Sequence, residues 1–112
     1  MIWKIIAEFP NYKISNTGLV KSIRRNIILK PMYDQYGYTC VNLRNKNIRK
    51  MYKIHRLVAK YFIDNNFNYS CVNHKNGIKD DNHVNNLEWV NHTMNMNHAY
   101  KLGLYKNKRS KT

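Results

Sequence analysis

The sequence predicts an α+β fold, in which a small, basic, β-rich N-terminal part is followed by a β-hairpin and a helix. Three observations support this prediction. Residues 12–54 contain short apolar or β-branched runs separated by Gly, Pro and Asn turns, a pattern typical of brief strands. Residues 55–63 change to a helical period. Two further apolar runs, 71–72 and 87–90, precede a polar segment that predicts a helix over about 93–102.

The strands of the N-terminal part are expected at residues 12–14, 19–23 and 26–29, with Pro10 and the Asn16-Thr17-Gly18 cluster marking turns. A hairpin is expected to follow, because residues 38–44 and 48–54 are two alternating runs on either side of a polar turn. The second run places Ile48, Tyr52 and Ile54 on one face and Arg49 and Lys53 on the other.

The first helix is expected over 55–63, because its apolar side chains recur on one face and a polar stretch, 64–68, ends it. This apolar stripe consists of Leu57, Val58, Tyr61 and Phe62. For the second helix, Asn91 is an expected N-terminal cap and Gly103 an expected end.

The charge of the chain indicates a polyanionic partner. The 112 residues include 20 Lys and Arg but 6 Asp and Glu, so the formal net charge is +14. Nucleic acid is the first candidate, although a ribosomal-type protein or a membrane-surface binder would carry the same charge. Between residues 21 and 60, eleven cations are opposed by one acid, Asp34. An ordinary solvated face is the alternative reading. The candidate phosphate-binding residues are Arg24, Arg25, Arg44, Arg49, Lys50, Lys53, Arg56 and Lys75.

The cysteines argue against one kind of metal site, and the apolar runs bear on the cellular compartment. Cys40 and Cys71 form no CxxC pair, which argues against a zinc finger with cysteine ligands. The apolar N-terminus is too short for the hydrophobic region of a secretory signal, and no run approaches the ~20 residues of a membrane span. We therefore expect a soluble, intracellular, cytoplasmic protein that is not secreted and has no membrane partner.

The stretch from Val72 to His98 concentrates groups that suit hydrolysis of a phosphodiester. A neutral histidine at a strand end, such as His74, can accept a proton from water near pH 7. A hard divalent cation takes oxygen ligands, including the side-chain carbonyls of Asn73 and Asn95. Strand alternation would let Asn73 face a metal while His74 faces the substrate. Taken alone, however, a single histidine such as His74 is more often structural.

These residues resemble the HNH endonucleases associated with mobile introns and with phage or large-virus genomes. The resemblance covers about residues 1–103, and residues 3–22 are similar to the small nuclease-associated modular domain that often precedes the nuclease. The matching elements are His55-Arg56-Leu57-Val58-Ala59, Phe62-Ile63, Val72-Asn73-His74-Lys75-Asn76-Gly77, Asp81-Asn82, Asn86-Leu87-Glu88-Trp89-Val90, Asn95 and His98-Ala99.

The resemblance implies a ββα-metal (HNH) nuclease unit that cleaves DNA. It assigns the general base to His74, the ligands of one divalent ion, Mg²⁺ or Mn²⁺, to Asn73 and Asn95, and a catalytic-site role to Asn86 in tying the loop to the hairpin. Many members have Asp where this chain has Asn73, and we expect the lost charge to weaken metal affinity. The residues that the resemblance places near the site are His98, His55 and Asp81. The alternatives are an exposed helix position for His98, packing at the start of the first helix for His55 and a turn role for Asp81.

The implied organisation is a modular DNA-binding region over 1–48, a nuclease unit over 49–104 and a basic tail over 105–112. Double-stranded DNA is the expected partner and a monomer the expected state, in a protein encoded by a phage or virus. One alternative is a nuclease-derived DNA-binding protein that no longer cuts. Another is a basic RNA-binding protein, which would share the charge but would not need the ordered His and Asn positions.

Overall fold

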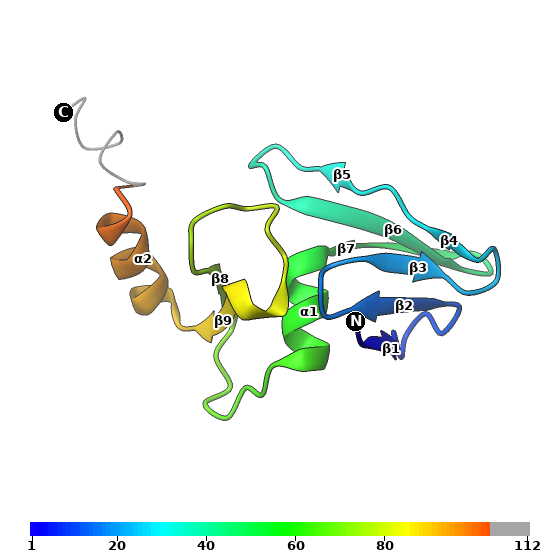
Figure 1. Ribbon diagram of the computed structural model, residues 1–112, viewed down its shortest axis with the longest axis horizontal. Coiled ribbons are helices and arrows are strands. Elements are labelled where there is room, and N and C mark those ends of the chain that lie inside the picture. The colour runs from blue at the N-terminus through cyan, green and yellow to red at the C-terminus, as the bar shows by residue number, and fades with distance from the viewer. Residues whose placement is uncertain (104–112) are drawn as a thin grey trace.

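The computed structural model describes residues 1–103, which form three small sheets and two α-helices (Figure 1). The α+β prediction is confirmed. The predicted tail at 105–112 lies outside the described residues. The strands are β1 (Trp3–Ile5), β2 (Tyr12–Ser15), β3 (Val20–Ser22), β4 (Ile27–Ile28), β5 (Met32–Tyr33), β6 (Thr39–Asn45), β7 (Ile48–Lys53), β8 (Cys71–His74) and β9 (Leu87–Val90). The helices are α1 (Ile54–Phe62), α2 (His92–Lys101) and a short 3₁₀ helix, η1 (Val84–Asn86).

The strands pair in antiparallel order along the chain. β1 to β4 form one sheet, β5 to β7 a second, and β8 with β9 the two-stranded hairpin of the predicted nuclease unit. The predicted strands at 12–14, 19–23 and 26–29 correspond to β2, β3 and β4. Strands β1 and β5 go beyond the sequence prediction, because runs of 3 and 2 residues are too short to show an alternating pattern.

The β6–β7 hairpin leads directly into α1. Its register pairs Val41 with Tyr52 and Asn45 with Ile48, so the predicted boundary between residues 48 and 49 falls inside this hairpin. The helix begins at Ile54, one residue earlier than predicted. Ile54 is buried as the first residue of the helix, whereas Ile48, the first residue of β7, is exposed. The two side chains therefore do not share the apolar face that the sequence predicted.

Helix α1 is the centre of the packing, because its apolar side chains touch sheets from both parts of the chain. Figure 1 shows α1 between the N-terminal sheets on the right and the β8–β9 hairpin on the left. One buried cluster joins all of these elements, with Ile14 and Val20 from the first sheet, Leu43 from the second, Val58 from α1 and Leu87 from β9. The predicted DNA-binding and nuclease regions therefore share one core.

Helix α2 packs against β8 and carries few buried contacts of its own. Its N-terminus is capped as predicted, since the Asn91 side chain accepts a hydrogen bond from Met94 N at 2.8 Å. Gly103 adopts the left-handed conformation that commonly ends a helix, with φ of 76°. Within residues 1–103, no helix has the length and apolar character needed to cross a membrane.

Candidate active site

A cavity of about 220 Å³ lies between the end of β8 and helix α2. Its lining brings together residues that are far apart in the sequence, including the predicted base and both predicted metal ligands. Asn73 and His74 both line the cavity, although they are neighbours on one strand. The lining residues are Tyr38, Val72, Asn73, His74, Gly77, Lys79, Asn95, His98 and Ala99.

The tautomer of His74 is set by a buried chain of hydrogen bonds. Asn82 Nδ2 donates to Thr39 Oγ1 at 2.7 Å, so Asn82 Oδ1 is left to accept from His74 Nε2 at 2.9 Å. A neutral imidazole with its proton on Nε2 holds a lone pair on Nδ1. Among the described residues, His55 Nδ1 is the one buried side-chain polar atom without a partner. His74 Nδ1 makes no hydrogen bond within residues 1–103 and is not a fully buried atom, and the His74 side chain lines the cavity.

Asn82 is a candidate site residue to which the sequence analysis gave no role, although it lies in one of the matching elements. It is 6% exposed and is enclosed by the N-terminal region. A Cβ atom on Gly18 would lie 2.8 Å from Asn82 Cβ, so only glycine fits beside it. Asp81, which the sequence analysis expected near the site, accepts a hydrogen bond from Asn76 Nδ2 within the loop and does not line the cavity. Its geometry fits the turn alternative.

Two aromatic rings enclose the imidazole of His74. The ring centroids of His55 and Tyr38 lie 4.9 and 5.7 Å from that of His74. Burial lowers the pKa of His74 more than its hydrogen bond to Asn82 raises it. Burial, followed by the nearby His74, lowers the pKa of His55 to about 3. Both imidazoles are therefore neutral at pH 7, and His55 packs against the predicted base without carrying charge.

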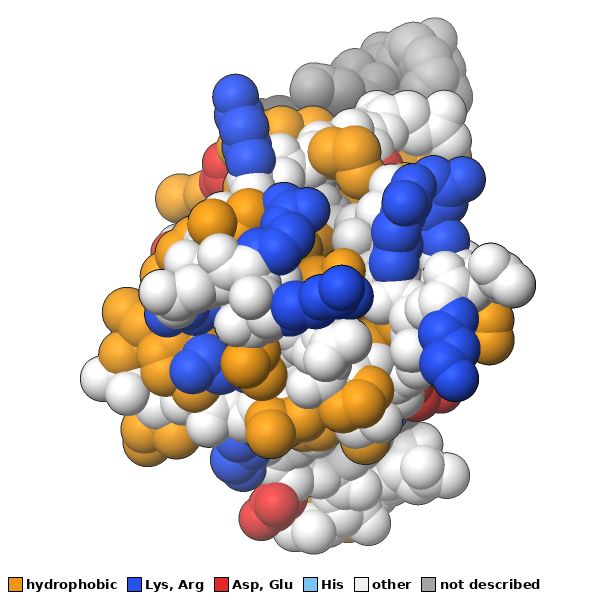
Figure 2. All heavy atoms as spheres, turned by 90° about the vertical axis from the view of Figure 1, so that its right-hand side faces the viewer, with side chains coloured by type: hydrophobic (Ala, Val, Ile, Leu, Met, Phe, Trp, Pro, Cys, Tyr) orange, Lys and Arg blue, Asp and Glu red, His pale blue; other side chains and the backbone are white. Residues whose placement is uncertain are grey.

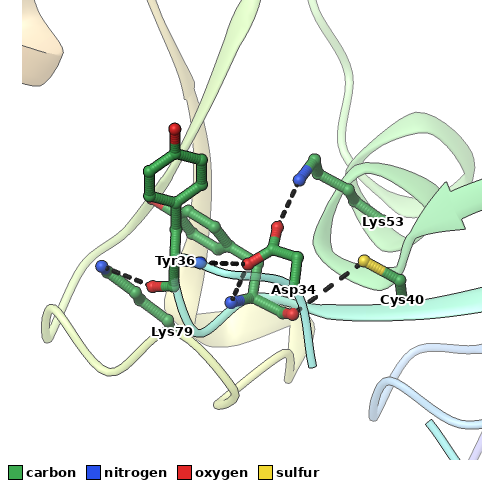
Figure 3. A network of polar contacts seen from close by, with 6 residues as sticks. Asp34, Tyr36, Cys40, Lys53 and Lys79 are labelled. Atoms are coloured by element: carbon green, nitrogen blue, oxygen red, sulfur yellow. Dashed lines mark hydrogen bonds and ion pairs between the residues drawn. The ribbon is translucent and has the colours of Figure 1, made fainter. Parts of the chain in front are cut away.

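The turn between β5 and β6 is held by hydrogen bonds that include the backbone of Tyr38. Figure 3 shows Asp34 of this turn beside Lys53, and Lys79 of the loop after β8 beside Tyr36. Asp34 Oδ1 accepts hydrogen bonds from the backbone N of Tyr36 and Tyr38, while Asp34 Oδ2 pairs with Lys53 Nζ at 2.5 Å. The hydrogen bond from Lys53 lowers the pKa of Asp34 to about 2. Lys79, in the loop, donates to the carbonyl of Tyr36 at 2.8 Å. The N-terminal region thus contacts the predicted nuclease loop from a second side.

Both predicted metal ligands, Asn73 and Asn95, line the cavity with amide side chains. Asn73 Nδ2 donates a hydrogen bond to Glu88 Oε2 at 2.8 Å. Asn73 Oδ1 accepts no hydrogen bond from the described residues and is not fully buried. The half-buried side chain of Asn95 makes no hydrogen bond within residues 1–103. His98, one turn further along α2, donates from Nε2 to the carbonyl of Lys75 at 2.8 Å, which ties α2 to the loop.

Asn86 closes the loop between β8 and β9 and does not line the cavity. Its Nδ2 donates to Asn76 Oδ1 at 3.0 Å and to the Asp81 carbonyl at 2.9 Å, and its Oδ1 accepts from Asn76 N at 3.1 Å. Its backbone carbonyl also accepts from Lys75 N at 2.7 Å. The geometry places Asn86 where the resemblance expects a loop tie, and a contribution to catalysis would act through the shape of the loop.

Comparisons with known proteins agree with this geometry. Residues 1–44 match the family model described as the NUMOD4 motif. The DNA endonuclease I-HmuI of Bacillus phage SP01 is 36% identical over 104 residues, which cover 92% of this chain and 60% of that protein. A solved structure titled "DNA binding and cleavage by the HNH homing endonuclease I-HmuI" superimposes with a TM-score of 0.83 over 92% of this chain. The chain is related to the HNH homing endonucleases.

A second relative is the uncharacterized HNH endonuclease L245 of Acanthamoeba polyphaga mimivirus. It is 44% identical over 109 residues, which cover 97% of this chain and 33% of that protein. The chain thus spans between a third and three fifths of the length of these relatives. The sequence resemblance, including that of the N-terminal region to a nuclease-associated module, is confirmed.

The predicted DNA-binding residues fall into two groups in this HNH-related fold. Arg24, Arg25, Arg44 and Arg49 surround shallow hollows at the end formed by the β3–β4 and β6–β7 turns. Lys30 and Lys46, which were not predicted, complete this set, and we call the six residues the basic end. Figure 2 views the molecule from this end and shows Lys and Arg side chains spread across it with few acids.

Three of the four remaining predicted cations have side-chain partners within the chain. Lys53 pairs with Asp34, and Arg56 Nη1 donates to the Ser70 carbonyl at 2.9 Å and lies over the ring of Trp89. Lys50 lies over the ring of Tyr52. Lys75 lines a hollow on the far side of the hairpin with Trp89. The contacts explain the positions of Lys53, Arg56 and Lys50 without DNA, so these three are weaker candidates for phosphate binding than the basic end.

Proposed function

We propose that this chain is a metal-dependent HNH endonuclease that hydrolyses phosphodiester bonds in double-stranded DNA, by a nick or a double-strand break. The observation that carries the proposal is the shared cavity, which is lined by the predicted base His74 and by both predicted amide ligands, Asn73 and Asn95. The names of the relatives, among them a DNA endonuclease, support the same chemistry. The net charge of +14 favours a polyanionic substrate.

In this proposal His74 accepts the proton of the attacking water at Nδ1. Its Nε2 proton stays on the hydrogen bond to Asn82 Oδ1, which orients the ring and stabilises the imidazolium formed when the water is deprotonated. The rings of Tyr38 and His55 exclude bulk water from one side of the imidazole. Because burial lowers the pKa of His74, the base is ready in its neutral form at pH 7.

The residues of the cavity fit a hard divalent cation. Amide oxygens are suitable ligands for Mg²⁺ or Mn²⁺, and Mg²⁺ usually keeps several positions for water and substrate phosphates. Residues 1–103 contain no group of three His, Cys, Asp or Glu side chains that could hold a metal, so Asn73 and Asn95 are the proposed ligands. Such an ion, when bound, would supply positive charge near the phosphoryl and leaving oxygens.

A plasmid-relaxation assay tests the proposed function directly. With Mg²⁺ or Mn²⁺ present, we expect supercoiled plasmid to become nicked or linear, because the ion supplies positive charge to the phosphoryl and leaving oxygens that the neutral amide ligands cannot provide. EDTA should stop the reaction and excess Mg²⁺ should restore it. Cleavage that continues in EDTA would contradict the proposed metal dependence. DNA binding without cleavage in the presence of any metal ion would support the non-cutting alternative.

The basic end should carry much of the affinity for DNA. Replacing both Arg44 and Arg49, a cross-strand pair on β6 and β7, by alanine should weaken duplex binding and lower the slope of log K against log salt by about 2, since each phosphate contact contributes roughly one unit. Fluorescence anisotropy at several salt concentrations measures both quantities. The Lys13→Ala/Lys60→Ala variant removes the same charge outside the basic end. An equal effect of the two variants would mean that net charge alone matters.

A further inference from the structure

We propose that Glu88 is the positioning residue for the metal ligand Asn73. Its carboxylate fixes the Asn73 amide with Oδ1 toward the cavity, and it supplies beside the ion the negative charge that position 73 itself lacks. This inference rests on the proposed function, because it gives Glu88 a part in metal binding. Nothing in the sequence analysis singled out Glu88 from the apolar strand that contains it.

The first argument is geometric. Asn73 and Glu88 are directly paired across the β8–β9 ladder, and the Asn73 side chain is 7% exposed. An ionised carboxylate can only accept hydrogen bonds, so it must receive the Nδ2 donor of Asn73. The contact of 2.8 Å from Nδ2 to Glu88 Oε2 thereby turns Oδ1 to the opposite side of the amide. Only Oδ1 can ligate a hard cation, and this contact leaves it facing accessible space.

The second argument is electrostatic. An asparagine ligand brings no charge, and this chain has few acids to spare against its 20 cations. Four of the other acids already have partners elsewhere: Glu8 with Tyr52, Asp34 with Lys53, Asp80 with Tyr33 and Asp81 with Asn76. Glu88 hydrogen-bonds a predicted ligand. A carboxylate behind a metal ligand orients it and raises its basicity, and the loss of such a partner typically costs about 10–100-fold in metal affinity.

Binding of Mn²⁺ to the whole chain without DNA tests the inference, with free Mn²⁺ measured by electron paramagnetic resonance. Glu88→Ala should weaken binding about 10–100-fold, because both the orientation and the charge are lost. Glu88→Gln should also weaken binding, since an amide can still accept from Asn73 but carries no charge. A purely structural role in the hairpin would leave the affinity of the Glu88→Gln variant equal to that of the wild type.

An exchange of the two groups provides the rescue. The Asn73→Asp/Glu88→Gln double variant keeps one carboxylate, one amide and one hydrogen bond between them, with the charge now on the ligand. It should bind Mn²⁺ at least as tightly as the wild type and clearly more tightly than Glu88→Gln alone. Asn73→Asp alone would place two carboxylates face to face and should unfold at a lower temperature in the absence of metal. Failure of the double variant to recover Mn²⁺ affinity would overturn the charge argument.

Asn95→Ala, measured in parallel, separates this inference from the proposed function. If the wild type binds Mn²⁺, and Asn95→Ala weakens binding while both Glu88 variants bind as the wild type does, only the role of Glu88 is overturned. If the wild type itself does not bind Mn²⁺, both proposals fail. Circular dichroism of each variant identifies loss of fold, and the Glu88→Gln and exchanged variants decide the matter if Glu88→Ala does not fold.

Discussion

The His74→Ala variant is expected to cleave DNA about 10²- to 10⁴-fold more slowly than the wild type, since that is the usual contribution of a general base. The hairpin should survive the change. Val72 and Leu87 pack against α1 from β8 and β9, and Trp89 Nε1 donates to the Ile63 carbonyl at 3.1 Å. Single-turnover cleavage of a labelled duplex, at saturating protein and Mg²⁺, measures the chemical step without product release.

The pH profile gives the same variant a second, independent signature. Protonated His74 cannot accept a proton, so the wild-type rate should rise as the pH increases through the pKa of His74. Because burial lowers this pKa, the rise should lie below the ordinary value of ~6.5, and the rate should be level near pH 7. The variant should lose the rise. His92→Ala, at an exposed position at the start of α2, is the matched control and should keep both rate and profile.

A folded His74→Ala protein that cuts at the wild-type rate would remove the assignment of the base. The enclosed ring of His55, with its pKa held at about 3, would be a poor replacement, and His98 would be the remaining imidazole that lines the cavity. The protein would still be a nuclease, with a proton acceptor other than His74. The experiment therefore tests the assignment of the base, whereas the plasmid-relaxation assay separates the enzyme from its non-cutting alternative.

The features that could be predicted from the sequence are those that a local pattern records. Alternation identified the β6–β7 hairpin, and the apolar stripe on Leu57 and Val58 identified α1. His74 and Asn73 were recognised because they stand together at a strand end, and Asn95 because a hairpin and the following helix are adjacent in space. Short-range spacing suffices for these positions, since the chain between them has few ways to fold.

The features that were missed depend on contacts between distant segments. Asn82 lies in a polar loop where no periodic pattern exists, and its partner Thr39 is 43 residues away. The role of Tyr38 beside His74 likewise depends on the turn between β5 and β6. Lys53 was placed on a DNA-binding face because strand alternation reports the side of a strand but not the partner, which is Asp34. A sequence pattern gives no direct measure of such pairings.

The most informative test of these distant contacts is the Asn82→Asp variant. A carboxylate at this position would accept the Nε2 proton of His74 and favour the imidazolium, so the pKa of His74 should rise by about 1–3 units. The Thr39 hydroxyl can donate to the second carboxylate oxygen, so the buried chain of hydrogen bonds can persist. The rise in cleavage rate should therefore move to higher pH, with a reduced rate at pH 6 and recovery toward pH 9. Single-turnover cleavage against pH measures the shift.

Two companion variants separate charge from orientation at Asn82. Asn82→Ala removes the acceptor and should lower the rate by about 10–100-fold, the usual cost of losing an orienting partner, without moving the profile upward. Thr39→Val keeps Asn82 but lets its amide rotate, so its effect should be in the same direction and smaller. Mn²⁺ affinity should stay at the wild-type value in all three variants, because Asn82 does not line the cavity with Asn73 and Asn95.

An Asn82→Asp protein that is folded and has the wild-type pH profile would contradict the hydrogen-bonded chain. An effect of Thr39→Val would show that the N-terminal region takes part in the chemistry. Thr39 belongs to the second sheet, and Gly18, where only glycine fits against Asn82, lies in the turn between β2 and β3. The region that matches the NUMOD4 motif would then contribute to the tautomer and pKa of the base. For that reason, residues 49–103 expressed without residues 1–48 should lack both the fold of this loop and the cleavage activity.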